Sequence, residues 1–202
     1  MRESGPIIAR GNIVPESLVQ ECLILRTMRT IAKPDASEFA PYTIIYIGLL
    51  PDDGLILDHL AENAKTTAAF MQSLTAQQLE YRYAPDKWTI KEILAHIIDD
   101  ERIYAYRALR FARNDATELP GFDQDTYAMY SGANSRSMSS LLDEFATVRS
   151  ATISLFENLP EEAMTRRGIA SGNVMSVRAA TYHIAGHELR HLNVIRERYL
   201  GF

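Results

Sequence analysis

The sequence predicts an all-α protein, a four-helix bundle with a long crossover loop and an irregular N-terminal extension. Three observations lead to this class. Four stretches of about 20 residues carry apolar side chains at three- and four-residue steps. Strand-like alternation is scarce. The chain has 202 residues, 47% hydrophobic and 23% charged, which is enough apolar material for the core of one domain.

The first two predicted helices have clear start signals. The first covers about residues 54–73 and follows a turn at 51–54, where Asp53 is suited to cap it. The second covers about residues 89–113 and begins with Thr89-Ile90-Lys91-Glu92. This string is a capping box, in which the threonine hydroxyl and the glutamate carboxylate accept hydrogen bonds from backbone N–H groups that the helix leaves free.

The other two helices are bounded by serine, proline and glycine. The third begins within residues 137–140 and stops before Pro160, which cannot continue a helix. The fourth begins near Ser176 and ends at Gly201, a residue suited to the left-handed conformation that ends helices. Only residues 42–50 are rich in β-formers, and a single strand there would need a partner from the amino-terminal segment.

A long connection separates the second and third helices. Residues 114–136 contain Pro120-Gly121 and exceed the connections that bundles usually need. Two interpretations are open. The segment either covers a site as a lid or crosses the end of the bundle as a plain connection. The predicted domain organisation is an extension at residues 1–30 followed by a bundle domain at 31–202.

Charge and cysteine content exclude several partners. The chain has 21 Lys and Arg against 26 Asp and Glu, a net charge of −5, which argues against nucleic-acid binding. The single cysteine, Cys22, rules out an internal disulfide and a thiolate metal cluster. No apolar run approaches the ~20 residues needed to span a bilayer, and no secretory signal is visible. We expect a cytoplasmic protein without a membrane partner.

The histidines are the most informative residues. His183, His187 and His191 follow one another at four-residue steps on the fourth predicted helix, so that neighbouring pairs share a helix face. On a helical wheel His187 and His191 fall within the apolar stripe, whereas His183 falls at its margin. Each buried imidazole needs a polar partner, and one metal ion satisfies several at once. Hydrogen-bonded core histidines are the alternative.

The string His187-Glu188-Leu189-Arg190-His191 matches the H-E-x-x-H signature of zinc metalloproteases. No histidine follows His191, and Glu197 lies on the same helix but points away from it, so a protease is the less favoured reading. A third ligand is better sought upstream, where His96 lies on the second predicted helix. Bundles build internal metal sites from ligands on facing helices.

These residues resemble a known family. The chain is similar to the DinB-like, or YfiT-like, metal-binding superfamily over about residues 30–200. The resemblance is carried by two motifs, Pro85-x-Lys87-Trp88-Thr89-x-x-Glu92-x-x-x-His96-x-x-Asp99-x-Glu101 and Gly186-His187-x-x-x-His191. It implies a four-helix bundle that binds one divalent metal ion through His96, His187 and His191. Met28 lies where related chains would begin, so residues 1–27 are expected to be an extension.

The resemblance implies one of two activities on a small molecule, metal-dependent hydrolysis or transfer chemistry on low-molecular-weight thiols. Three neutral histidines leave a metal ion an open position, as in catalytic sites. Imidazole accepts Zn, Ni, Mn and Fe, so the sequence does not choose among them. A non-catalytic metal-binding stress-response protein is the alternative. The DNA-damage association in the family name describes regulation and does not imply DNA binding.

Two carboxylates are candidates for a general base or for orienting a ligand, Glu188 and Asp100. The alternatives are that Glu188 pairs with an arginine and that Asp100 is solvated. Arg107 faces the same side of its helix as His96, and an arginine there could bind an anion, although cations near a helix carboxyl end also favour the helix dipole.

The remaining marked residues receive plainer interpretations. We expect His183 to be an ordinary polar residue at the helix margin rather than a residue that orients a ligand, and His59 to face solvent. Trp88, immediately before a helix cap, is expected to be core packing. Exposed apolar residues of the bundle make a homodimer possible.

Overall fold

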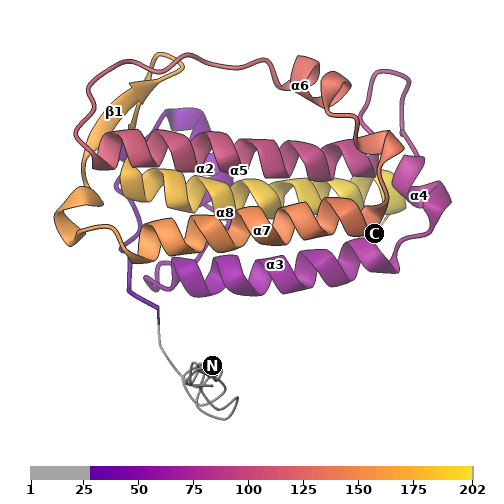
Figure 1. Cartoon of the computed structure of the whole chain (residues 1–202), viewed down its shortest axis with the longest axis horizontal. Coiled ribbons are helices and arrows are strands. Elements are labelled where there is room, and N and C mark those ends of the chain that lie inside the picture. The colour runs from indigo at the N-terminus through magenta and orange to yellow at the C-terminus, as the bar shows by residue number, and fades with distance from the viewer. Residues whose placement is uncertain (1–27, 202) are drawn as a thin grey trace, which may run out of the picture.

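The computed structural model describes residues 28–201, and four long helices form its body (Figure 1). They confirm the all-α bundle. Each lies within a few residues of its predicted range, the fourth continuing as the π-helical segment Ile195–Leu200. The residue after that segment, Gly201, is left-handed with φ of 73°. The helices are α3 (Ile56–Ser73), α5 (Ile90–Ala112), α7 (Met138–Glu157) and α8 (Val177–Val194).

Local capping explains where the helices begin. Thr89 and Glu92 form the predicted capping box at the start of α5. The hydroxyls of Ser137 and Ser176 accept backbone N–H bonds at the starts of α7 and α8. At α3 the prediction is corrected, because Asp53 accepts from the backbone N–H of Leu55 in the preceding turn and the helix starts later.

The long connection is a crossover that runs back along the bundle. In Figure 1, α5 and α7 run in the same direction, so the chain must return past the length of α5 before α7 can start. The connection contains α6 (Gln124–Tyr130) and a short 3₁₀ turn, η3 (Ala133–Ser135). It is also anchored, since Leu119 exchanges backbone hydrogen bonds with Ile169 and Ser171.

A small antiparallel hairpin, absent from the prediction, joins α7 to α8. Its strands are β1 (Arg167–Ala170) and β2 (Asn173–Ser176), with Ala170 opposite Asn173. The two turn residues, Ser171 and Gly172, have φ of 53° and 71°, the conformation that two-residue hairpins require. The Ser-Gly pair between Ile169 and Val174 was the available sequence signal.

The β-rich segment at residues 42–50 is helical rather than a strand. It forms a 3₁₀ turn, η2 (Pro41–Thr43), and the single-turn α2 (Ile44–Ile47). The buried positions are four and three residues apart, as in a helix, with Thr43, Ile47 and Leu50 inside and Ile44 exposed. α2 packs on α8 at Gly186, where a Cβ atom would lie 2.3 Å from the carbonyl oxygen of Tyr46. Glycine is therefore what permits this close approach.

A layer of buried polar side chains crosses the bundle between two apolar clusters. One cluster includes Phe111, Phe156 and Tyr182, and the other includes Ile93 and Phe145. The residues between them, which we call the polar layer, are buried or half-buried. They are Thr67 of α3; His96, Asp100 and Glu101 of α5; Arg149 of α7; and His183, His187, Glu188 and His191 of α8.

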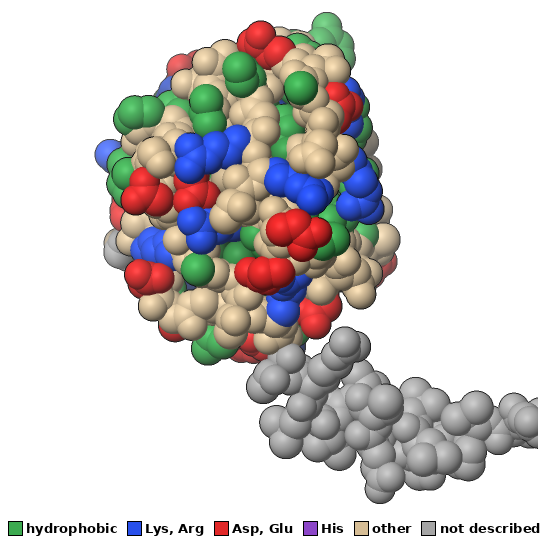
Figure 2. Space-filling view, turned by 90° about the vertical axis from the view of Figure 1, so that its left-hand side faces the viewer, with side chains coloured by type: hydrophobic (Ala, Val, Ile, Leu, Met, Phe, Trp, Pro, Cys, Tyr) green, Lys and Arg blue, Asp and Glu red, His purple; other side chains and the backbone are tan. Residues whose placement is uncertain are grey.

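The other described elements are short: η1 (Ala36–Glu38), α4 (Ala76–Glu80) and η4 (Glu161–Ala163). At the end of the molecule beside β1, acidic and basic side chains are interspersed (Figure 2). None of the helices in the described part is long and apolar enough to cross a membrane. The expectations about residues 1–27, including the extension and Cys22, lie outside the described residues.

Candidate metal centre

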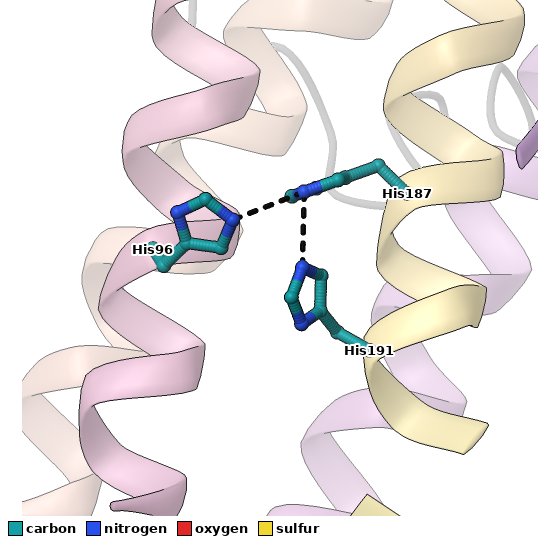
Figure 3. A group of neighbouring side chains, drawn as sticks. All are labelled: His96, His187 and His191. Atoms are coloured by element: carbon teal, nitrogen blue, oxygen red, sulfur yellow. Dashed lines mark hydrogen bonds between the residues drawn. The ribbon is translucent and has the colours of Figure 1, made fainter. Parts of the chain in front are cut away.

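Three histidines from two helices converge inside the bundle (Figure 3). His96 projects from α5, and His187 and His191 project from successive turns of α8. The Nε2 atom of His187 lies 3.0 Å from Nε2 of His96 and 3.1 Å from Nε2 of His191. His96 and His187 are buried, and His191 is partly buried. The structure thus brings together the three residues that the sequence marked as metal ligands.

This arrangement fits a divalent metal ion. Nitrogen ligands at about 2.0–2.1 Å in a tetrahedral shell lie roughly 3.3 Å from one another, close to the separations in the cluster. Burial lowers the pKa of His96, and it lowers the pKa of His187 well below the usual value. Burial also lowers the pKa of His191 to about 3. The imidazoles are therefore neutral, the form that binds metal ions.

Asp100 lies behind His187, on the side away from the cluster. Its Oδ2 atom is 3.3 Å from Nδ1 of His187 and 3.1 Å from Nε2 of His183. Burial alone would raise the pKa of Asp100, but the imidazoles of His187 and His183 outweigh burial and hold the pKa below its usual range. A proton on Nδ1 of His187 would face this carboxylate, and the Nε2 lone pair would then face the cluster.

The structure corrects two expectations from the sequence, one about the solvation of Asp100 and one about the place of His183. Asp100 is 4% exposed and is not solvated. His183 is 2% exposed, not an ordinary residue at the helix margin, and its ring stacks on Tyr104 with centroids 3.6 Å apart. Asp100, His183 and His187 form a second group whose ligand atoms lie within 4.8 Å, in which Asp100 is hydrogen-bonded to His183 and lies at ion-pair distance from His187.

Glu188 projects to the opposite side of α8 from its neighbour His187. One carboxylate oxygen accepts a hydrogen bond from the hydroxyl of Thr67, and the other lies 2.9 Å from Nη2 of Arg149. Arg149 also pairs with Glu101 at 2.8 Å. Both oxygens of Glu188 are therefore engaged away from the histidine cluster, an arrangement unlike the general base of an H-E-x-x-H protease.

Two cavities each contact one histidine of the cluster. One, of about 180 Å³, is lined by Asp100, His183 and His187, and the other, of about 210 Å³, is lined by Trp88 and His191. In the described part of the chain, the grouping of His96, His187 and His191 includes no fourth histidine, cysteine or carboxylate. A metal ion in the cluster would therefore retain positions open to a ligand from a cavity.

Comparison with protein families identifies the family of this chain. The DinB superfamily model matches residues 59–195, which include all three histidines and the helices that carry them. The chain belongs to the DinB superfamily.

Two proteins of known name or structure resemble this DinB-superfamily chain. A protein of Oceanobacillus iheyensis named "Putative metal-dependent hydrolase" is 27% identical over 128 residues, covering 62% of this chain and 73% of its own length. YfiT from Bacillus subtilis, described as "a probable metal-dependent hydrolase with an unusual four-helix bundle topology", has the same fold. The TM-score is 0.61 at 17% identity, over 82% of this chain and 90% of YfiT.

Two residues of this DinB-superfamily site were not marked as such from the sequence. Trp88, expected to be core packing, lies against the cluster with its ring centroid 4.8 Å from that of His96. Tyr46 of α2 places its ring edge against His183 and His187 at 5.0 and 5.3 Å. Both come from segments outside the histidine helices, so helical spacing carries no signal for them. His59 is half-buried and bonded to Asp53 rather than fully solvent-facing.

Proposed function

We propose that this chain is a metal-dependent enzyme that acts on a small molecule, by hydrolysis or by transfer chemistry on a low-molecular-weight thiol. The observation that carries the proposal is the position of Nε2 of His187, 3.0 Å from Nε2 of His96 and 3.1 Å from Nε2 of His191, beside two cavities. The names of the relatives support the hydrolytic branch. The thiol branch rests on the affinity of imidazole-bound ions for thiolates.

His96, His187 and His191 would hold one divalent ion, which is Zn, Ni, Mn or Fe. When bound, such an ion supplies Lewis acidity to a water molecule or a substrate thiol. Asp100 holds the proton of His187 on Nδ1 and so keeps Nε2 free to act as a ligand. We assign Asp100 this positioning role, and Glu188 the role of holding α8 through Arg149.

Aromatic side chains pack against the histidines on two sides. Trp88 covers His96 and His191, and Tyr46 covers His183 and His187. Burial lowers the pKa values of His96, His187 and His191 and so favours their neutral forms. Substrate therefore reaches the site through the two cavities, where His187 and His191 are the ligands that line the walls.

The test is turnover by metal-free protein reloaded separately with Zn, Ni, Mn or Fe. One arm measures hydrolysis of p-nitrophenyl esters and small amides. The other measures transfer of cysteine or glutathione to an electrophilic dinitrophenyl halide. We expect turnover in one arm that falls at least about 100-fold in His187→Ala. Lys65→Ala, on the exposed face of α3, is the matched control and retains activity.

The contradicting result is stoichiometric metal binding without turnover in either arm for all four metals. The chain would then be a metal-binding protein without catalysis, in which the ion ties α5 to α8.

A further inference from the structure

Arg107 is a buried cation at the boundary between two cavities. It lies on α5, seven residues and about two helical turns after Asp100, and it is 4% exposed. The 180 Å³ cavity that reaches His187 is also lined by Arg107. Arg107 also lines a further cavity of about 550 Å³, which lies between α5 and the crossover.

The neighbours of the Arg107 guanidinium are neutral. Its Nη2 atom donates to the carbonyl oxygen of Pro120 at 3.1 Å and to the hydroxyl of Ser171 at 3.0 Å. Its central carbon lies 4.9 Å from the ring centroid of Tyr104 and 6.0 Å from that of Phe122. Among residues 28–201, Nε and Nη1 have no hydrogen-bond partner, and no carboxylate lies within ion-pair distance of Arg107.

Other arginines near this site are paired. Arg102 and Arg110 line the larger cavity with Arg107, and they form ion pairs with Glu144 and Asp115 respectively. The fully buried Arg149 pairs with two glutamates. Because burying a charge without a counter-charge is costly, Arg107 is the exception that requires a reason.

The nearest acidic residue on the same face of α5 does not fill this role. Asp100 is separated from Arg107 by a rise of roughly 10 Å along the helix. Its carboxylate is hydrogen-bonded to His183 and lies 3.3 Å from Nδ1 of His187. The guanidinium therefore retains donors in a cavity that also reaches a histidine of the cluster.

We propose that Arg107 binds the carboxylate group of a small-molecule ligand, with the hydroxyl of Ser171 beside it. This inference rests on the proposed function, because it places the carboxylate at one end of the 180 Å³ cavity and the rest of the ligand toward His187. The planar guanidinium fork matches a carboxylate in two parallel hydrogen bonds. A single cation without a second unpaired basic group suits a monoanion better than a phosphate dianion. The substrate class is therefore a small carboxylic acid.

The probe is benzoate, with the neutral benzamide of similar shape as its control. Each is titrated into the full chain after metal removal, so that a carboxylate cannot bind an ion instead. The readouts are heat of binding and the side-chain Nε–H NMR signal that is missing from R107K. We expect saturable benzoate binding that shifts this signal, and no shift with benzamide.

Three variants separate the contributions. R107Q removes the charge and should weaken benzoate binding at least about tenfold. R107K keeps the charge but loses the fork, and should bind with intermediate affinity. R102Q changes an arginine of the same cavity that already has a carboxylate partner, and should bind benzoate like the wild type. Thermal unfolding establishes that each variant is folded.

The inference is overturned if the folded wild-type chain does not bind benzoate, or if R107Q binds it equally well. Inorganic phosphate that binds at Arg107 more tightly than benzoate would overturn the choice of a carboxylate. The metal-free titration also separates this inference from the proposed function. Benzoate binding through Arg107 in a chain that takes up no metal contradicts only the proposed function. Turnover without benzoate binding contradicts only the carboxylate site.

Discussion

Helix α8 separates two halves of the polar layer that differ in how completely the protein satisfies them. On the side facing α3 and α7, Arg149 donates to Glu101, to Glu188 and to the backbone carbonyl of Leu60. Thr67 donates to the remaining oxygen of Glu188. On the side facing α5, the imidazoles have incomplete partners. The buried Nδ1 atoms of His96 and His183 have none among the described residues.

This difference teaches which half is structural and which half is available to a ligand. A buried charge network that satisfies itself holds helices in register and has no remaining donors or acceptors to offer. Neutral imidazoles beside cavities retain lone pairs that a metal ion can use. His187 and Glu188 are adjacent in the sequence, yet they belong to different halves. The H-E-x-x-H string therefore combines two residues of the centre, His187 and His191, with one residue of the scaffold, Glu188.

The largest expected effect comes from breaking the paired half. Arg149→Ala leaves Glu101 and Glu188 buried without their counter-charge, so the free energy of unfolding should fall by about 3–5 kcal/mol. The measurement is urea unfolding of metal-free protein. Lys65→Ala, which removes an exposed pair with Glu62, should leave stability unchanged. A similar small loss in both variants would show that the network does not hold the bundle together.

The second-largest expected effect is a loss of stability in acid, caused by a carboxylate that lies at the amino end of α8. Burial would raise the pKa of Glu38, but hydrogen bonds from Arg178 and Ser176 outweigh burial and lower the pKa from 4.5 to about 2. Because the folded pKa is depressed, the stabilisation is present above pH 4.5 and is lost as pH falls toward 2. The amount is roughly 2–3 kcal/mol.

The check is the free energy of unfolding measured between pH 6 and pH 2 for wild type and Glu38→Gln. The difference between the two proteins should shrink as the pH falls through this window. A constant difference would contradict the assignment of the acid sensitivity to Glu38. The result can also be compared with that for Arg149→Ala. It gives the contribution of one paired carboxylate to the free energy of unfolding beside that of the larger network.

A smaller effect should distinguish the two carboxylates that the sequence could not separate. Asp100→Asn removes the carboxylate charge behind His187 and should weaken metal affinity about 10- to 100-fold. Glu188→Gln is the matched control, since it lies next to the same ligand but on the other side of α8. It should lower stability and leave metal affinity unchanged. Competition with a chromophoric chelator measures both, and the opposite ranking would reverse the roles assigned here.

Much of the fold could be predicted because its signals are local. The capping box at Thr89 and the periodicity of residues 138–157 depend on neighbours three or four positions away, so the helix bounds came close. The segment at residues 42–50 received no helix prediction, because its side chains are β-forming and the packing that makes it helical is not visible in the sequence. Its single helical turn lies on α8, where Gly186 permits the contact. The intrinsic β preference of side chains is weak, and tertiary packing of this kind overrides it.

The candidate site could be predicted in part for the same reason. The spacing of His187 and His191 is local, and the family resemblance supplied His96. His183 was misjudged because a helical wheel does not show that α2 and Tyr104 cover the margin of α8. The partners of Glu188 lie 39 and 121 positions away in the sequence, so nothing near that residue could indicate them.

The most direct test of the central claim is metal content, measured by mass spectrometry on protein purified without a metal-affinity column. Wild type, His187→Ala and Glu188→Gln are compared after incubation with each candidate metal and removal of excess. The account predicts close to one equivalent in wild type and Glu188→Gln and none in His187→Ala. Absence of metal from wild type after reconstitution, or equal metal in wild type and His187→Ala, would contradict it.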